Sequence, residues 1–108
     1  MKSQEMNLNI RYDAPREIWD KILSIYCQLN GWLGYGRGSN LGQVGIPYWF
    51  SYDEKDKHIC ASVEPSGLHF TGLMDDAEWG LWIAEIKRIA TKELGYKVGE
   101  IEKGEVDY

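Results

Sequence analysis

The chain has 108 residues, of which 17 are acidic and 12 are basic, and its formal net charge at pH 7 is −5. This length suits one domain spanning residues 1–108, and it excludes a large multidomain enzyme, a two-half dinucleotide-binding unit and a long repeat array. Hydrophobic residues make up 44% and charged residues 27% of the chain, which is typical of a folded globular domain rather than of a disordered chain.

The sequence shows neither the pattern of a secretory signal nor that of a membrane-spanning helix. The N-terminal segment lacks the apolar core of a secretory signal, and no apolar run approaches the roughly 20 residues that a membrane helix requires. We therefore expect a cytoplasmic protein that makes no contact with membranes. Cys27 falls on the apolar face of a predicted helix and Cys60 within a predicted strand. Because the reducing cytosol disfavours disulfides, we expect two ordinary thiols, buried or half-buried.

The charge is unevenly distributed. Residues 1–50 hold five basic and four acidic residues, whereas residues 51–108 hold seven basic and thirteen acidic ones. An acidic surface repels the phosphates of nucleic acids and attracts basic partners. The sequence therefore argues against direct binding of DNA or RNA and favours contact with a basic protein.

The first two elements are a strand and a helix. Residues 7–12 alternate between apolar and polar side chains, which predicts a strand with one buried face. A helix over roughly residues 14–29 follows, because Asp13 offers an N-cap and Pro15 suits a first helical turn. Its apolar stripe recurs at helical spacing and consists of Ile18, Ile22, Ile25 and Leu29, widened by Trp19, Leu23 and Tyr26. Gly31 should end the helix in a left-handed conformation.

A glycine-rich segment comes next. Six of the fifteen residues in 31–45 are Gly, a density that predicts a loop rather than a regular element. The glycines follow a helix and precede a strand, and Arg37 is the single charge, so the segment does not match a phosphate-binding loop. Two interpretations stay open, namely a flexible connection and a loop that binds a protein through Trp32 and Tyr35.

Three strands and a second helix complete the pattern. The predicted strands are Pro47–Tyr52, Lys57–Glu64 and Gly67–Leu73, joined by hairpin-sized turns. Asp75 or Asp76 should cap a helix that runs to Leu94-Gly95, with Trp79 and Trp82 in its buried stripe. Part of the tail from Tyr96 to Tyr108 is predicted as a short edge strand. This order predicts an α+β domain of two layers, with an antiparallel sheet of about four to five strands and two helices on one face.

The histidines suggest no firm chemistry. His58 and His69 should face the same side of the sheet, where Cys60 would complete a set of metal ligands. A structural zinc site, however, usually has four ligands, and the nearby carboxylates lie in turns. Ordinary strand residues are the simpler interpretation, and no signature marks Cys60 as a nucleophile paired with a histidine. We therefore expect no metal, no cofactor and no enzymatic activity.

The carboxylates form two groups. The turn cluster consists of Asp53, Glu54 and Asp56, and the helix cluster consists of Asp75, Asp76 and Glu78. A solvated turn and the capping of a helix would explain them without any function. Alternatively, the fold brings both clusters into one acidic patch that binds a partner. Trp49 adds an aromatic candidate, because consecutive residues of a strand face opposite sides and either Trp49 or its two neighbours must face away from the helices.

Several general features resemble one class of proteins. They are the compact two-helix layout, Gly31-Trp32 after the first helix, the acidic region 51–108 and the helix end at Leu94-Gly95-Tyr96. Together they resemble the small acidic immunity proteins of bacterial toxin–immunity systems. This resemblance implies a protein that neutralises a cognate toxin, often a basic nuclease, by direct binding.

We therefore expect a binding module that contacts another, basic protein. The expected contact residues are Trp32, Tyr35, Trp49, Asp53, Glu54, Asp56, Asp75, Asp76 and Glu78. The alternatives are a regulatory or structural subunit, including a homodimer formed through an exposed edge, and a domain that binds a small ligand at the glycine-rich segment.

Overall fold

The computed structural model describes residues 1–36 and 45–107. In chain order they are β1 (Lys2–Leu8), α1 (Arg16–Gln28), β2 (Trp32–Tyr35), β3 (Pro47–Trp49), β4 (His58–Glu64), β5 (Gly67–Met74) and α2 (Asp76–Leu94). The strands form one antiparallel sheet in the order β1-β5-β4-β3-β2.

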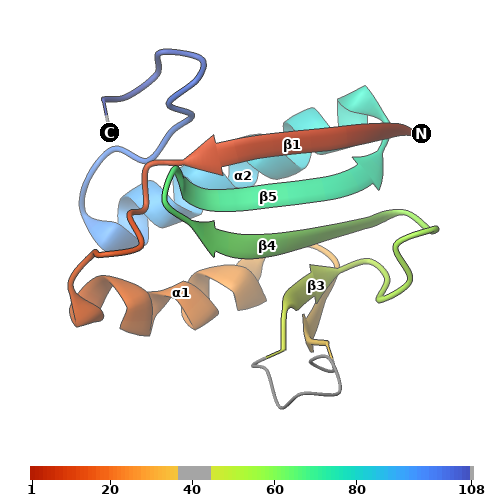
Figure 1. The fold of residues 1–108 in the computed structure, drawn as a ribbon, viewed down its shortest axis with the longest axis horizontal. Helices are drawn as coiled ribbons and strands as arrows, with labels where there is room; N and C mark the ends of the chain where they lie inside the picture. Colours follow the sequence, from red (N-terminus) through yellow and green to blue (C-terminus); the bar gives the residue numbers. More distant parts are fainter. Residues whose placement is uncertain (37–44, 108) are drawn as a thin grey trace.

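Both helices cover one face of this sheet. In Figure 1, α2 crosses behind β1 and β5, and α1 lies along the side of β4, so that the opposite sheet face is uncovered and turned toward the viewer. The predicted α+β architecture, with an antiparallel sheet and two helices on one face, is confirmed. Among the described residues, no helix combines the length and the apolar character needed to cross a membrane.

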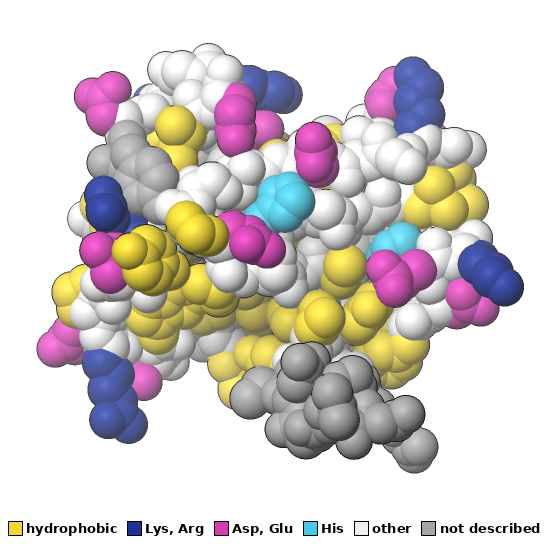
Figure 2. Space-filling view, in the orientation of Figure 1, with side chains coloured by type: hydrophobic (Ala, Val, Ile, Leu, Met, Phe, Trp, Pro, Cys, Tyr) yellow, Lys and Arg dark blue, Asp and Glu magenta, His cyan; other side chains and the backbone are white. Residues whose placement is uncertain are grey.

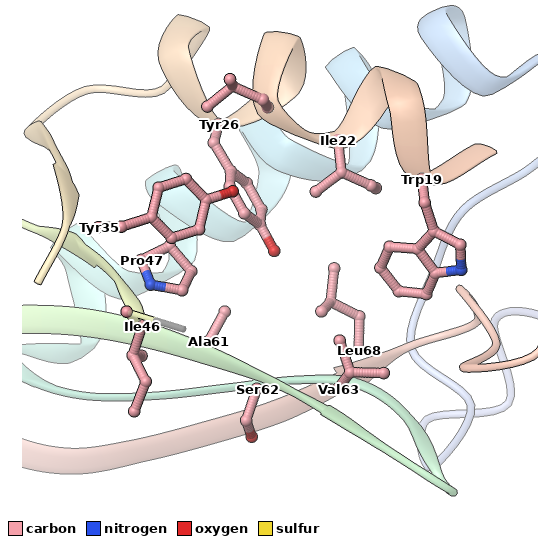
Figure 3. A pocket seen from close by; sticks show the side chains of 12 residues that line it. Trp19, Ile22, Tyr26, Tyr35, Ile46, Pro47, Ala61, Ser62, Val63 and Leu68 are labelled. Atoms are coloured by element: carbon pink, nitrogen blue, oxygen red, sulfur yellow. The ribbon is translucent and has the colours of Figure 1, made fainter. Parts of the chain in front are cut away.

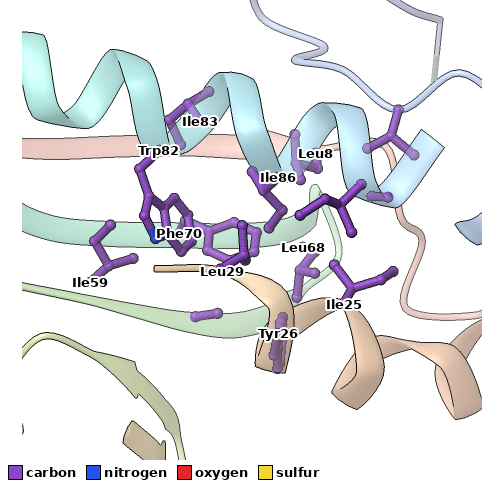
Figure 4. Close-up of a cluster of buried hydrophobic side chains, with 14 of the residues drawn as sticks. Leu8, Ile25, Tyr26, Leu29, Ile59, Leu68, Phe70, Trp82, Ile83 and Ile86 are labelled. Atoms are coloured by element: carbon purple, nitrogen blue, oxygen red, sulfur yellow. The ribbon is translucent and has the colours of Figure 1, made fainter. Parts of the chain in front are cut away.

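The core between the layers is dominated by aromatic rings. Trp49 is 0% exposed and lies at its centre. The ring centroids of Tyr26, Trp82 and Trp32 lie 4.9, 5.1 and 5.2 Å from that of Trp49. The indole N–H of Trp49 donates to the carbonyl oxygen of Tyr26 at 3.3 Å, so this large polar ring is buried with its donor satisfied. Figure 4 shows Phe70 among buried side chains that include Leu29, which follows α1, and Trp82 and Ile86 of α2.

The two helices begin differently. Asp75 caps α2 as predicted, accepting a hydrogen bond from the backbone N–H of Glu78 at 3.1 Å. The predicted cap of α1 is wrong, because Pro15 occupies that position and Asp13 instead accepts a hydrogen bond from Nε of Arg11 at 2.9 Å. Gly95 ends α2 with φ +81°, as predicted. The predicted end of α1 at Gly31 is wrong, because this helix ends at Gln28 and its C-cap, Leu29, is extended.

The buried stripe of α1 is narrower than its sequence pattern. Ile22, Ile25 and Tyr26 are the buried residues of this helix. Leu23 and Cys27 are exposed instead. The prediction that both thiols are buried or half-buried is therefore wrong for Cys27 and confirmed for the half-buried Cys60. In this helix only the side that carries Ile22, Ile25 and Tyr26 is buried in the core, and Leu23 and Cys27 lie beyond it.

The first strand begins earlier than predicted. β1 covers Lys2–Leu8, and only Met6 and Leu8 within it are buried. Its polar N-terminal half belongs to the sheet because Lys2 pairs with Met74 in an unbroken ladder that ends at Leu8 and Leu68. An edge strand is held by backbone pairing, which the alternation of side chains does not reveal. Tyr12, at the end of the predicted strand, is exposed and outside it.

The glycine-rich segment contains a strand that its composition did not predict. Gly31 has φ +87°, and a Cβ there would lie 2.7 Å from the ring of Phe50. Gly34 has φ +114° and lies at a shift of register in the pairing of β2 with β3. These glycines accommodate a bulge and a close approach, so they permit β2 instead of preventing it. The part of the predicted loop at residues 37–44 lies outside the described residues.

The C-terminal tail crosses back over the end of β1. It forms an isolated bridge between Leu8 and Glu100 rather than the predicted edge strand. Nζ of Lys87 on α2 lies 2.6 Å from Oε2 of Glu100 and 2.9 Å from Oε1 of Glu105. We call these three residues the tail clasp. Because it ties the tail to α2, the clasp closes one end of the core.

Candidate functional site

The two acidic clusters lie at the same end of the sheet. His58, the first residue of β4, is opposite Leu73, which lies near the end of β5. The turn cluster immediately precedes β4 and the helix cluster immediately follows β5, so antiparallel pairing brings them together. A salt bridge of 2.7 Å between Nζ of Lys57 and Oε2 of Glu78 joins the two segments.

Much of this negative charge already has partners within the chain. Asp75 caps α2, and Glu78 accepts from Lys57. Asp76 accepts from Nζ of Lys2 at 2.8 Å and from Nε2 of Gln4 at 2.9 Å, and these bonds lower the pKa of its carboxyl group. The helix cluster is therefore structural as well as acidic. The turn cluster is exposed and is the part of this end better placed to attract a basic surface.

The three aromatic residues that we expected to contact a partner differ in exposure. Trp49 cannot contact a partner, because it faces the helices and has no exposed surface, so its assignment to a binding surface is wrong. Tyr48, its neighbour, faces the open side of the sheet. Trp32 is half-buried against Tyr26 and Trp49. Tyr35 is exposed and packs edge-on against Trp32 at 5.8 Å between ring centroids.

An apolar groove lies between α1 and the edge of β4. Figure 3 shows side chains of α1, among them Trp19 and Ile22, facing Ala61 and Val63 of β4 across this space, with Ile46 and Pro47 at one end. Its volume is about 390 Å³, and none of the described residues that line it is charged. Leu23 and Val63 are large apolar side chains of the lining that are about half exposed, at 49% and 52%. Among the described residues, the rim of the groove is therefore apolar and partly exposed.

The groove borders a strand edge without a neighbour. β5 pairs with β4 along its whole length, but β3 pairs only with Ile59 and Cys60. Of the strands that the structure describes, none pairs with residues 61–64 of β4 on the side away from β5. The β2–β3 hairpin turns away instead, and it is extended by a 2.7 Å hydrogen bond from the N–H of Gly36 to the carbonyl oxygen of Ile46. An unpaired strand edge can accept an additional strand.

Sequence reasoning missed this groove because its residues match ordinary core patterns. Leu23 continues the apolar stripe of α1, and Val63 continues the alternation of β4. One available signal was Pro47 at the start of a three-residue strand. Proline lacks the N–H that a central strand uses, so it indicates an edge or the end of pairing.

The open face of the sheet is mostly polar. The two histidines do not converge, because His58 is opposite Leu73 whereas His69 is opposite Ser62, four residues further along β4. Figure 2 shows them apart on this face, each beside an acidic side chain. Nε2 of His69 lies 3.4 Å from Oε2 of Glu5. The combination of both histidines with Cys60, weighed from the sequence, is therefore wrong in geometry.

A different set of ligand types meets around His58. Glu54, His58 and Cys60 each place one possible ligand atom so that all three atoms lie within 4.8 Å of one another. Sγ of Cys60 lies 3.3 Å from Oγ1 of Thr71. Burial raises the pKa of the Cys60 thiol, the hydrogen bond with Thr71 opposes this rise, and the carboxylate of Glu54 adds to it. Glu54 connects the turn cluster with the open face.

Comparisons of the chain with protein-family models, curated proteins and solved structures found no match.

Proposed function

We propose that this protein is a non-enzymatic binding module that holds a protein partner in the groove beside β4. The observation that carries the proposal is a groove with an exposed apolar rim beside the edge of β4, where none of the described residues supplies a charge to the lining or a strand to pair with residues 61–64. Monomeric proteins rarely leave such combinations without a use, because an open strand edge and apolar surface both promote unwanted association.

The expected occupant is an extended, apolar segment of the partner. Its backbone would pair with residues 61–64, and alternate side chains would enter the groove toward Trp19 and Ile22. Backbone pairing supplies affinity in this mode of binding, and the apolar contacts supply specificity. Leu23 and Val63 lie at the rim, where a partner would cover them.

The partner in this proposal is a basic bacterial toxin, whose activity the bound protein blocks. The net charge of −5 and the exposed turn cluster support a basic partner, because complementary charge accelerates association. A nuclease has a basic surface for phosphate, so it suits an acidic inhibitor. The general resemblance to immunity proteins points to the same class of partner.

The first experiment is co-expression of the tagged protein with the product of the neighbouring gene. A stable complex that abolishes a toxic activity of that product would support the proposal. The absence of a complex would refute the toxin assignment.

A matched pair of variants tests the groove. Leu23→Glu places a charge at the rim, whereas Leu81→Glu places the same charge on α2 at a side chain that is 76% exposed and distant from the groove lining. We expect Leu23→Glu to weaken binding by about tenfold or more, as for a buried contact residue, and Leu81→Glu to bind like the unchanged protein. Equal binding by both variants would refute the groove as the site.

The turn cluster is tested separately by salt. The combined change of Asp53→Asn, Glu54→Gln and Asp56→Asn removes its charge. We expect slower association at low ionic strength and a smaller salt dependence, with little change in dissociation. An unchanged salt dependence would show that the turn cluster does not steer the partner.

A small apolar ligand is a second candidate occupant. The groove volume of about 390 Å³ falls in the range of ligand sites, and aromatic residues line it. A ligand that binds without the partner and competes with it would favour this alternative.

A further inference from the structure

A second site lies on the open face of the sheet, at the start of β4. It is formed by Glu54, His58 and Cys60, which supply a carboxylate, an imidazole and a thiol. His58 and Cys60 are two residues apart on one strand and therefore point to the same face. Glu54 comes from the preceding turn and lies close enough for its ligand atom to be within 4.8 Å of theirs.

His58 is oriented as a metal ligand would be. Its side chain is only 6% exposed, and its Nδ1 lies 2.9 Å from the carbonyl oxygen of Asp56. Because a carbonyl oxygen can only accept, Nδ1 is the donor in this contact, and Nε2 is left as the ring nitrogen that can bind a metal. In the part of the chain that the structure describes, no hydrogen bond engages this Nε2. A histidine ligand with its other nitrogen bound to a carbonyl is the usual arrangement in metal sites.

The surroundings of Cys60 are also suitable. The hydroxyl of Thr71 lies 3.3 Å from its sulfur and can donate to a thiolate. Tyr48 is on the neighbouring strand, and its ring centroid lies 6.4 Å from that of His58. Its pKa is raised by burial and then by the charge of Glu54. These neighbours give the three ligands a partly enclosed setting.

We propose that Glu54, His58 and Cys60 bind a zinc ion, with water in the fourth position. Nitrogen, sulfur and carboxylate oxygen are the ligands that zinc accepts, and three protein ligands with one open position form a recognised type of zinc site. Bond lengths of about 2.0 to 2.3 Å place neighbouring ligand atoms roughly 3.5 Å apart in a tetrahedral site. Because the three atoms lie within 4.8 Å of one another, they would have to approach by no more than about 1.3 Å, and the exposed Glu54 side chain is the one best able to move.

The site differs from the binding groove in residues and in chemistry. The groove is lined by uncharged residues at the other end of β4, from Ala61 to Val63. None of the three ligands lines it. Zinc binding can therefore be tested apart from occupancy of the groove, although Glu54 also belongs to the turn cluster that steers the partner in the proposed function.

The probe for this site is Co²⁺, which occupies zinc sites and reports its ligands spectroscopically. The protein is prepared without a polyhistidine tag and is reduced with a phosphine that does not bind metals. We expect one Co²⁺ per chain, a near-ultraviolet charge-transfer band from the thiolate and visible bands of tetrahedral coordination. Added Zn²⁺ should displace the Co²⁺ and remove these bands.

Matched variants assign the ligands. Cys60→Ser should abolish the charge-transfer band, and Glu54→Gln, at an exposed turn position, should weaken binding by about tenfold or more. Cys27→Ser and His69→Gln change the other cysteine and the other histidine, so they should bind like the unchanged protein. Circular dichroism of each variant checks that it is folded. No binding by the unchanged protein, or a charge-transfer band that persists in Cys60→Ser, would overturn the proposal.

Discussion

The tail clasp offers a sharp test of how the C-terminal tail is held. Lys87 on α2 bonds two carboxylates, Glu100 at 2.6 Å and Glu105 at 2.9 Å. The side chain of Glu100 is only 7% exposed, whereas that of Lys87 is 22% exposed. Lys87→Met keeps the length and the apolar part of the side chain and removes its charge. Glu100 then remains as a buried carboxylate without its nearest cation.

The size of the effect follows from this burial. Removing one partner of a fully buried ion pair costs about 3–5 kcal/mol, because the remaining charge is left in an apolar environment. Here the cost is smaller, since Lys87 is partly solvated and Nζ of Lys103 lies 3.7 Å from the same oxygen of Glu100. We expect the free energy of unfolding to fall by about 2 kcal/mol. For a domain of this size, that corresponds to a decrease in Tm of roughly 10 °C.

Urea unfolding followed by tryptophan fluorescence measures this loss. Lys92→Met is the matched control, because Lys92 is an exposed lysine in the last turn of the same helix. The double variant Lys87→Met with Glu100→Gln removes both charges and should recover part of the stability. If Lys87→Met unfolds within about 0.5 kcal/mol of Lys92→Met, the clasp does not hold the tail.

Three other predictions follow from local geometry. The pKa of Glu105 is lowered by the hydrogen bond from the backbone N–H of Glu100 and by Lys87 of the clasp. The stability that Glu105 contributes is therefore present above its ordinary pKa of 4.5 and is lost as the pH falls through the lowered pKa. Acid titration of the unfolding free energy should show this decline, and the decline should be steeper than in Lys87→Met. Cys27 is exposed, whereas Cys60 is half-buried and its pKa is raised by burial. A maleimide should therefore label Cys27 first. Faster labelling of Cys60 would contradict this arrangement. Gly31→Ala should destabilise the fold by about 1–3 kcal/mol, because alanine is strained at φ +87° and its Cβ would collide with a ring; a thermal melt unchanged from that of the parent protein would contradict this packing.

The sequence predicted those elements whose side-chain pattern and capping chemistry agree. Asp75 and Gly95 bound the second helix because a side-chain acceptor and a left-handed glycine satisfy its ends. β4 and β5 were predicted within one residue at each end, since one face of each alternates into the core. Asp13 failed as a cap because Arg11 offers its carboxylate a different partner, and a sequence pattern cannot rank these two bonds.

The strands that pair mainly through their backbones were harder to predict. The polar half of β1 is in the sheet because Lys2 aligns with Met74, seventy-two residues away in the chain. β2 lies within a segment whose glycine content predicts a loop, yet Gly31 and Gly34 are needed there for close approach and a bulge. Backbone hydrogen bonds leave no periodicity in side-chain type, so such strands are invisible to pattern analysis.

In the candidate sites too, features set by neighbouring residues of the sequence were predicted, and features set by the pairing of distant strands were not. Alternation along β4 correctly placed His58 and Cys60 on one face. It also offered His69 as their neighbour, but the register sets His69 opposite Ser62, four residues beyond His58. The residue that does place a ligand atom near both is Glu54, only four residues before His58. The resulting pattern, a glutamate followed by three residues, a histidine, one residue and a cysteine, can be recognised in a sequence.

The groove has no such signature, because it exists only where the β2–β3 hairpin leaves β4. If the two sites serve separate purposes, related chains should be able to lose this ligand pattern while keeping the apolar residues at Leu23 and Val63.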